Sequence, residues 1–287
     1  MDELSTEQPL IEPLIEPPPD KSSSPIYVVN YGNDVRRYDM IQRVAHLLPG
    51  VRVHFSPGLS VSDPIFKDLG AFPLRTWAVV LDHLANIRHF YESNKPYGLF
   101  CEDDLMVHRD LSKLLPQVYK NCMENNWDVC LLASLLLEPP PESSVVGVGP
   151  TCDQNSDGVQ VTTQVSTVVS TEVTTQATVR VTTQVTTEVT TVRKYYTYTD
   201  DMWGAHMYVL SREYARYLLE KYTLEWAQAN PTIPFCSDWT ITKDASSRVL
   251  LYPPLGVEEG SVGCDDWSQI QFHRQSHLFM YDPRFYV

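Results

Sequence analysis

Three consecutive carboxylates, Glu102, Asp103 and Asp104, directly follow an apolar run at 97–101, and apolar residues resume at 105–107. The pattern predicts a buried strand that ends in an acidic cluster. Functional side chains of open α/β sheets gather at the carboxyl ends of the strands, so carboxylates there are well placed to hold a divalent cation. The alternative is an acidic turn, or the first turn of a helix beginning near Asp110, where negative charge suits the helix dipole.

Glu102 and Asp104 are two residues apart, and both can reach one Mg or Mn ion. Such an ion takes oxygen ligands and fills the rest of its shell with water or phosphate oxygens. In sugar transfer from a nucleotide donor, a bound divalent ion acts as a Lewis acid that neutralises the departing diphosphate. An acidic protein can therefore hold a diphosphate without a basic patch.

The composition excludes some classes of partner. The formal net charge is -14, whereas nucleic acids and anionic membranes attract basic surfaces, so we expect neither as a general partner. The hydrophobic fraction of 43% suffices for a sizeable core. The six cysteines form no C-x-x-C pair, so a structural zinc site is not expected. The chain has no recognisable signal peptide or transmembrane segment, which favours a cytoplasmic protein.

The chain divides into three parts. Residues 1–24 are rich in Pro, Glu and Ser and are expected to be a disordered tail or a short docking motif. Residues 25–287 hold one folded domain of about 210 residues once the insertion at 155–195 is set aside. Strand 26–30, helix 36–48 and strand 51–55 form a βαβ unit, which predicts a parallel sheet. Further expected elements are helices at 75–93, near 111–119 and at 212–222 with Ser211 as N-cap, and strands at 127–133, 205–210 and 249–252.

The insertion contains a tetrad repeat close to Val-Thr-Thr-Gln that runs from 161 to 192. Val and Thr are β-branched, and a period of four is a multiple of the strand period, so a β-arm or hairpin is the physical interpretation. The repeat leaves the register weakly specified. Disorder and pairing with another chain, which would give self-association, therefore remain alternatives.

Several segments are similar, in order and spacing, to those of a known family. They are Ile26-Tyr27-Val28-Val29-Asn30 with Arg36-Arg37, Leu81-Asp82-His83, Tyr97-Gly98-Leu99-Phe100-Cys101-Glu102-Asp103-Asp104, Trp203-Gly204-Ala205-His206-Met207-Tyr208-Val209-Leu210-Ser211, Ser237-Asp238-Trp239 and Tyr252-Pro253-Pro254-Leu255. Together they resemble glycosyltransferase family 25, which includes lipooligosaccharide and collagen galactosyltransferases and has relatives in large DNA viruses. For a viral member the expected location is the host cytoplasm or the virion.

The resemblance implies a GT-A-like fold, a single α/β domain with a mixed, mainly parallel sheet. It implies inverting transfer of a hexose from a UDP-sugar to a hydroxyl of a glycan or protein, with Mn or Mg as cofactor. Glu102 and Asp104 would be the metal ligands, and Asp103 would contact the donor ribose or sugar. The other residues that it places at or near the donor are Asn30, Tyr31, Arg36, Arg37 and His83.

An inverting transfer needs a base for the acceptor hydroxyl, and Asp238 is the candidate. A late histidine, His273 or His277, is an alternative further metal ligand. Asp200-Asp201 and Asp265-Asp266 are expected to be solvated turns, and Trp203 and Trp239 to be core residues rather than sugar platforms. The competing hypothesis is an inactive transferase-like binding or structural module whose Val/Thr arm mediates assembly.

Overall fold

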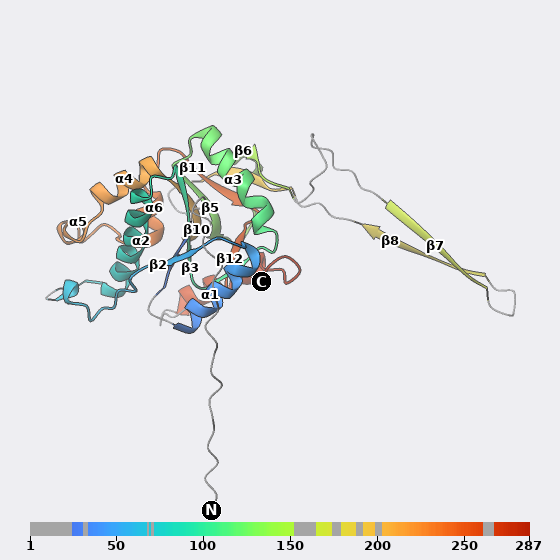
Figure 1. The fold of residues 1–287 in the computed structure, drawn as a ribbon, viewed down its shortest axis with the longest axis horizontal. Coiled ribbons are helices and arrows are strands. Elements are labelled where there is room, and N and C mark those ends of the chain that lie inside the picture. The colour runs from blue at the N-terminus through green and yellow to red at the C-terminus, as the bar shows by residue number, and fades with distance from the viewer. Residues whose placement is uncertain are drawn as a thin grey trace, which may run out of the picture.

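The structure is a computed structural model that describes residues 25–30, 34–67, 69, 72–151, 165–173, 179–187, 192–198, 203–260 and 267–287 (Figure 1). The tail expected at 1–24, Tyr31, Asp200-Asp201 and Asp265-Asp266 lie outside these residues. The strands are β1 (Ile26–Val29), β2 (Val53–Phe55), β3 (Tyr97–Glu102), β4 (Leu105–Val107), β5 (Val129–Leu135), β6 (Val145–Val148), β7 (Val165–Val173), β8 (Val179–Thr187), β9 (Lys194–Thr197), β10 (Trp203–Ser211), β11 (Arg248–Tyr252) and β12 (Gly256–Glu258). The α-helices are α1 (Asp34–Leu47), α2 (Leu74–Glu92), α3 (Leu111–Asn125), α4 (Arg212–Lys221), α5 (Leu224–Ala229), α6 (Ser237–Thr242) and α7 (Trp267–Met280).

Eight strands form one mixed sheet in the order β2-β1-β3-β10-β5-β11-β9-β6. Parallel pairs join β2 to β1, β1 to β3 and β5 to β11, and the other neighbours are antiparallel. Strands β10 and β9 therefore run against the other six, so the expected mixed α/β sheet, mainly parallel in strand direction, is present. Of the seven pairs of neighbouring strands in this sheet, however, three are parallel and four are antiparallel.

The sheet is covered on both faces. On one face, the side chains of Ile26 and Cys101 pack with Met40 of α1 and Leu114 of α3. On the other, Tyr27, Phe100 and Tyr208 pack with α2, α4 and α6. Burial on both faces explains why these strands read as continuous apolar runs instead of alternating ones.

The elements that carry the periodic patterns form where the sequence predicts them. Helix α2 begins one residue before the expected helix and ends one residue before its expected end. The Ser211 hydroxyl accepts the Tyr214 amide proton, as expected of the N-cap of α4. No helix in the described ranges combines the length and the apolarity needed to cross a membrane.

The tetrad repeat contains two antiparallel strands, β7 and β8. Val165 lies opposite Thr187, and Val173 lies opposite Val179. The hairpin interpretation is therefore confirmed for 165–173 and 179–187, while the rest of the insertion apart from 192–195 lies outside the described residues.

Strand β4, which follows the acidic cluster, contacts β12 and Val287. Strand β4 pairs with β12, and Val107 exchanges two backbone hydrogen bonds with Val287, of 2.8 and 3.0 Å. His108 is buried there against Phe285 and Tyr286, and its Nδ1 accepts the Asp110 amide proton at 3.1 Å. Burial, followed by the nearby Arg193 cation, lowers the pKa of His108 to about 4. The folded protein therefore keeps this imidazole neutral.

Because the unfolded chain takes up a proton on His108 near its ordinary pKa, acid favours unfolding between about pH 6.5 and pH 4. We expect the variant His108→Asn, whose side-chain oxygen can still accept the Asp110 amide proton, to lose this dependence. Between pH 7 and pH 4.5 the unmodified chain should lose about 2 to 3 kcal/mol more free energy of unfolding than the variant. Urea unfolding at the two pH values measures the difference, and equal losses would show that His108 does not titrate as described.

Candidate functional site

The acidic cluster lies at the carboxyl end of β3, as predicted from the sequence. Glu102 is the last residue of β3, and Asp103 and Asp104 connect it to β4. Val29 of β1 pairs with Glu102, and Met207 of β10 pairs with Cys101 on the other side. Asn30, which follows Val29, and His206, which precedes Met207, are therefore brought beside the carboxylates.

The Glu102 carboxylate lies between two buried histidines. Its Oε2 is 2.8 Å from His206 Nδ1, and its Oε1 is 3.3 Å from His83 Nε2. The other ring nitrogen of His83 is 3.0 Å from the Tyr208 hydroxyl. Burial alone would raise the pKa of Glu102, but His206 and then His83 hold that pKa well below its ordinary value. Glu102 is therefore a charged carboxylate whose two oxygens are fixed in direction.

His206 supplies the positive charge that balances this carboxylate. Burial alone would lower the pKa of His206, but Glu102, with smaller contributions from Asp104 and Asp238, raises it to about 10. Its Nε2 is buried and has no hydrogen-bond partner among the described residues. A divalent cation placed here would supply the same compensating charge and engage a ring nitrogen.

One carboxylate oxygen of Asp104 is buried and accepts no hydrogen bond from the described residues. Its Oδ1 makes no hydrogen bond within the described part of the chain, and its Oδ2 lies 3.8 Å from Arg36 Nη1. Burial and then the charge of Glu102 raise the pKa of Asp104 to about 7. An orphaned carboxylate oxygen beside another carboxylate fits a hard divalent cation, which prefers oxygen ligands.

Four residues that the sequence predicts to contact a nucleotide-sugar donor form one polar patch beside the acidic cluster. Asn30 Nδ2 donates a hydrogen bond to Asp103 Oδ2, and Arg37 Nε donates to Asn30 Oδ1 at 2.6 Å. Arg36 Nη1 is 3.4 Å from Asp103 Oδ1, and the Arg36 side chain is 34% exposed. The patch therefore presents a guanidinium to solvent at the edge of the acidic cluster.

His206 reaches Glu102 because β10 bulges beside β5. Trp203 pairs with Leu135 and Met207 with Ala133, so 204–206 lie opposite the single residue Ser134. Gly204 has φ +100°, and a Cβ atom there would lie 2.6 Å from the Leu135 backbone nitrogen. Only glycine meets both demands, so Gly204 allows the bulge that positions His206.

Asp238, the predicted base, lies in the first turn of α6 and supports the same bulge. Its Oδ1 accepts the Ala205 amide proton at 2.6 Å. This hydrogen bond ties Asp238 to the residue that directly precedes His206. The contact gives it a positioning role beside the site, and its role as base stays a prediction.

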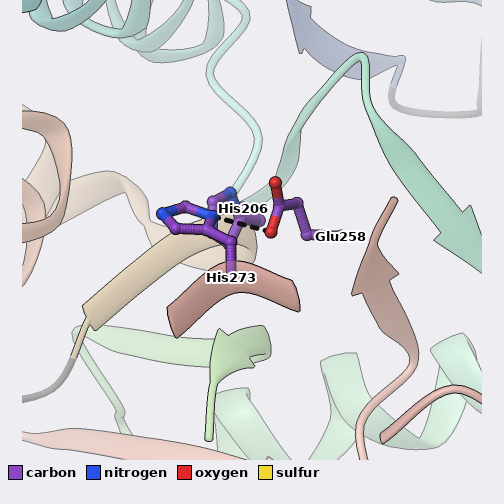
Figure 2. A group of neighbouring side chains, drawn as sticks. All are labelled: His206, Glu258 and His273. Atoms are coloured by element: carbon purple, nitrogen blue, oxygen red, sulfur yellow. Dashed lines mark hydrogen bonds and ion pairs between the residues drawn. The ribbon is translucent and has the colours of Figure 1, made fainter. Parts of the chain in front are cut away.

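A second group of side chains meets at His206 (Figure 2). A ring nitrogen of His206, a carboxylate oxygen of Glu258 and a ring nitrogen of His273 lie within 4.8 Å of one another. His273 Nδ1 is 2.8 Å from Glu258 Oε2. His277, the other late histidine considered from the sequence, instead bonds through Nδ1 to the backbone oxygen of Glu258 at 2.6 Å.

The sequence interpretation missed His206 and Glu258 as site residues. Glu102, Asp104 and His206 form a group whose ligand atoms lie within 4.8 Å of one another, so His206 completes the pair predicted to hold the metal. Its signal was a polar residue two positions after Gly204, in the otherwise apolar segment 205–210. Glu258 gave no such signal, because its place depends on the pairing of β12 with β4.

No protein-family model and no curated protein sequence matches this chain.

The structure brings together Asn30, Arg36, Arg37, His83, Glu102, Asp103 and Asp104, with Asp238 beside them through Ala205.

Substitution of Gly204 tests the bulge. Gly204→Ala meets both a positive φ and a backbone clash, so we expect the free energy of unfolding to fall by at least about 2 kcal/mol. Two matched glycines separate these causes. Gly50 has φ +82° but open space around it, and Gly147 has ordinary contacts and no positive φ.

We expect Gly50→Ala to cost about 1 kcal/mol and Gly147→Ala to have an effect of less than about 0.5 kcal/mol. Urea unfolding of the three variants measures these differences. If Gly204→Ala is no more destabilising than Gly50→Ala, the close approach to Leu135 does not constrain β10.

Proposed function

We propose that this chain is a metal-dependent glycosyltransferase with a GT-A-like fold. It would move a hexose from a nucleotide-diphosphate sugar, UDP-linked by the resemblance to family 25, to a hydroxyl of a glycan or protein, with inversion. The observation that carries the proposal is the acidic strand end, where two carboxylates, a buried histidine and an arginine-bearing polar patch converge.

Glu102, Asp104 and His206 would hold the metal, because they offer two carboxylate oxygens and one imidazole nitrogen close together. Mn accepts such a mixed oxygen and nitrogen set, and Mg favours the two carboxylates. When bound, the ion supplies Lewis-acid stabilisation of the diphosphate that leaves. His83 would act as a positioning residue, because its side chain is only 1% exposed and its Nε2 faces Glu102.

The polar patch would bind the donor. Arg36 is partly exposed and would pair with a phosphate oxygen, while Asp103 would accept hydrogen bonds from ribose or sugar hydroxyls. Asn30 and Arg37 hold Asp103 in place through the chain of hydrogen bonds described above. Tyr31, which follows directly in the sequence, stays a predicted contact of the nucleotide.

Transfer requires that the acceptor oxygen attack the anomeric carbon while its proton leaves. In the proposed reaction, Asp238 takes this proton, a bond forms from the acceptor oxygen to the anomeric carbon, and the bond to the diphosphate breaks. Attack opposite the leaving group inverts the anomeric centre. Asp238 can serve only through the oxygen that does not hold the Ala205 amide.

The competing proposal is an inactive module in which the Val/Thr arm mediates assembly. The observation that supports it is the two-stranded sheet of β7 and β8, because the outer edges of such a sheet could pair with further strands. The two proposals differ in whether the acidic cluster binds a donor.

Ligand-induced stabilisation distinguishes them. UDP together with Mn should stabilise the chain by about 2.7 kcal/mol when the ligand is at 100 times its Kd. Asp104→Asn should lose most of this gain, because one of the two carboxylates that would hold the ion is neutralised. Asp39→Asn, an exposed aspartate on α1, is the matched control and should keep the gain. Thermal unfolding with and without UDP and Mn is the measurement, and equal gains in all three proteins would count against the transferase.

Asp238→Asn tests the base without removing the bulge, because the Asn side-chain oxygen can still accept the Ala205 amide proton. If Asp238 is the base, turnover with a panel of UDP-sugars should fall about 100- to 10,000-fold, while stabilisation by UDP and Mn stays unchanged. If Asp238 only supports the bulge, turnover should be retained. The pair of measurements therefore separates proton transfer from positioning.

A further inference from the structure

Glu258 and His273, which form a group with His206, are not used by the proposed reaction. The residues come from β10, β12 and α7, which approach one another only in the folded protein. Glu258 and His206 are 4% and 8% exposed, and the His273 side chain is 18% exposed. Two imidazoles and one carboxylate thus converge at a mostly buried point, at which His273 is partly exposed to solvent.

The spacing of these ligand atoms suits a metal ion. Tetrahedral ligation at about 2.0 to 2.1 Å places neighbouring ligand atoms about 3.3 Å apart. His273 Nδ1 and Glu258 Oε2 are already 2.8 Å apart, and all three ligand atoms lie within 4.8 Å of one another. Small side-chain adjustments would therefore admit an ion between them.

The surroundings hold the ligands in place as the outer shell of a metal site does. His277, one turn after His273 on α7, fixes the backbone of Glu258 through its hydrogen bond of 2.6 Å. Gly260 leaves room for His277, since a Cβ atom there would lie 3.0 Å from the His277 Cβ. His206 makes its contact with Glu102 through Nδ1, while Nε2 is buried without a hydrogen-bond partner among the described residues.

We propose that His206, Glu258 and His273 form a second cation site, which prefers Zn²⁺ over Mg²⁺ and Mn²⁺. Two nitrogen ligands and one oxygen are a donor set typical of zinc, with a fourth position left for water, whereas the carboxylate pair Glu102 and Asp104 suits the harder ions. The ion would tie α7 and β12 to the bulge of β10. The site shares His206 with the group proposed to hold the transferase metal, but binding of Zn²⁺ to it needs no nucleotide.

Zinc binding to the full chain tests this site. The chain is first freed of metal by dialysis against a chelator, and Zn²⁺ affinity is then measured by competition with a chromogenic chelator. Glu258→Gln and His273→Gln should each weaken Zn²⁺ binding at least about 100-fold, because each removes a ligand. Asp104→Asn, which removes none of the three proposed zinc ligands, should keep Zn²⁺ affinity within about threefold.

His277→Gln is the matched control, because it removes a histidine from the same helix without removing a proposed ligand. Its loss should stay within the roughly 10- to 100-fold range of an outer-shell residue and below that of His273→Gln. Circular dichroism and thermal unfolding of the metal-free variants establish that each one folds. Zinc X-ray absorption should show nitrogen and oxygen at about 2.0 to 2.1 Å, whereas sulfur near 2.3 Å would identify cysteine ligation.

Three results would overturn the proposal: unchanged Zn²⁺ affinity in both Glu258→Gln and His273→Gln, equal loss in Asp104→Asn, or sulfur ligation. Equal loss in Asp104→Asn would mean one shared ion at the carboxylate cluster. Stabilisation of Glu258→Gln by UDP and Mn reports on the transferase separately. A failed zinc site therefore leaves that proposal intact, and a failed transferase leaves the zinc measurement valid.

Discussion

The site depends on the contact of Glu102 with two buried histidines. It joins three elements, because Glu102 ends β3, His83 lies on the preceding helix α2, and His206 lies on β10, more than 100 residues further along the chain. Removing a carboxylate from water costs several kcal/mol unless hydrogen bonds and opposite charge replace the lost hydration. Here His206 provides the charge and both histidines provide polar contacts, so the carboxylate can stay charged at the end of a buried strand.

Helix α2 links this contact to the neighbouring loop. Asp82, next to His83, is buried and accepts the amide protons of Gly58 and Leu59 at 3.0 and 2.9 Å. One turn of α2 therefore fixes both Glu102 and the chain that leaves β2. The apolar residues of α2 that pack on the sheet hold this turn in place. Packing of α2 in the core thus helps to hold the polar contacts of Asp82 and His83 in place.

The sequence predicts the parts of this arrangement that are local. Periodic apolar residues predict α2, and the change from apolar residues to carboxylates predicts the end of β3. Neither His206 nor Glu258 can be placed in this way, because their positions depend on a bulge between β10 and β5 and on pairing between β12 and β4. Gly204 is a local sign of the bulge, but its positive φ and its approach to Leu135 become evident only once the strands are paired.

His206 makes the two groups of ligands interdependent. It belongs both to the group with Glu102 and Asp104 and to the group with Glu258 and His273. A neutral imidazole has one lone pair for a metal, and its second nitrogen carries a proton. An ion bound by one group therefore changes the charge and the hydrogen bonding that His206 offers to the other. Because Gly204 and Asp238 constrain the backbone around His206, coupling between the two proposed sites would pass through the ring protons and the bound ions.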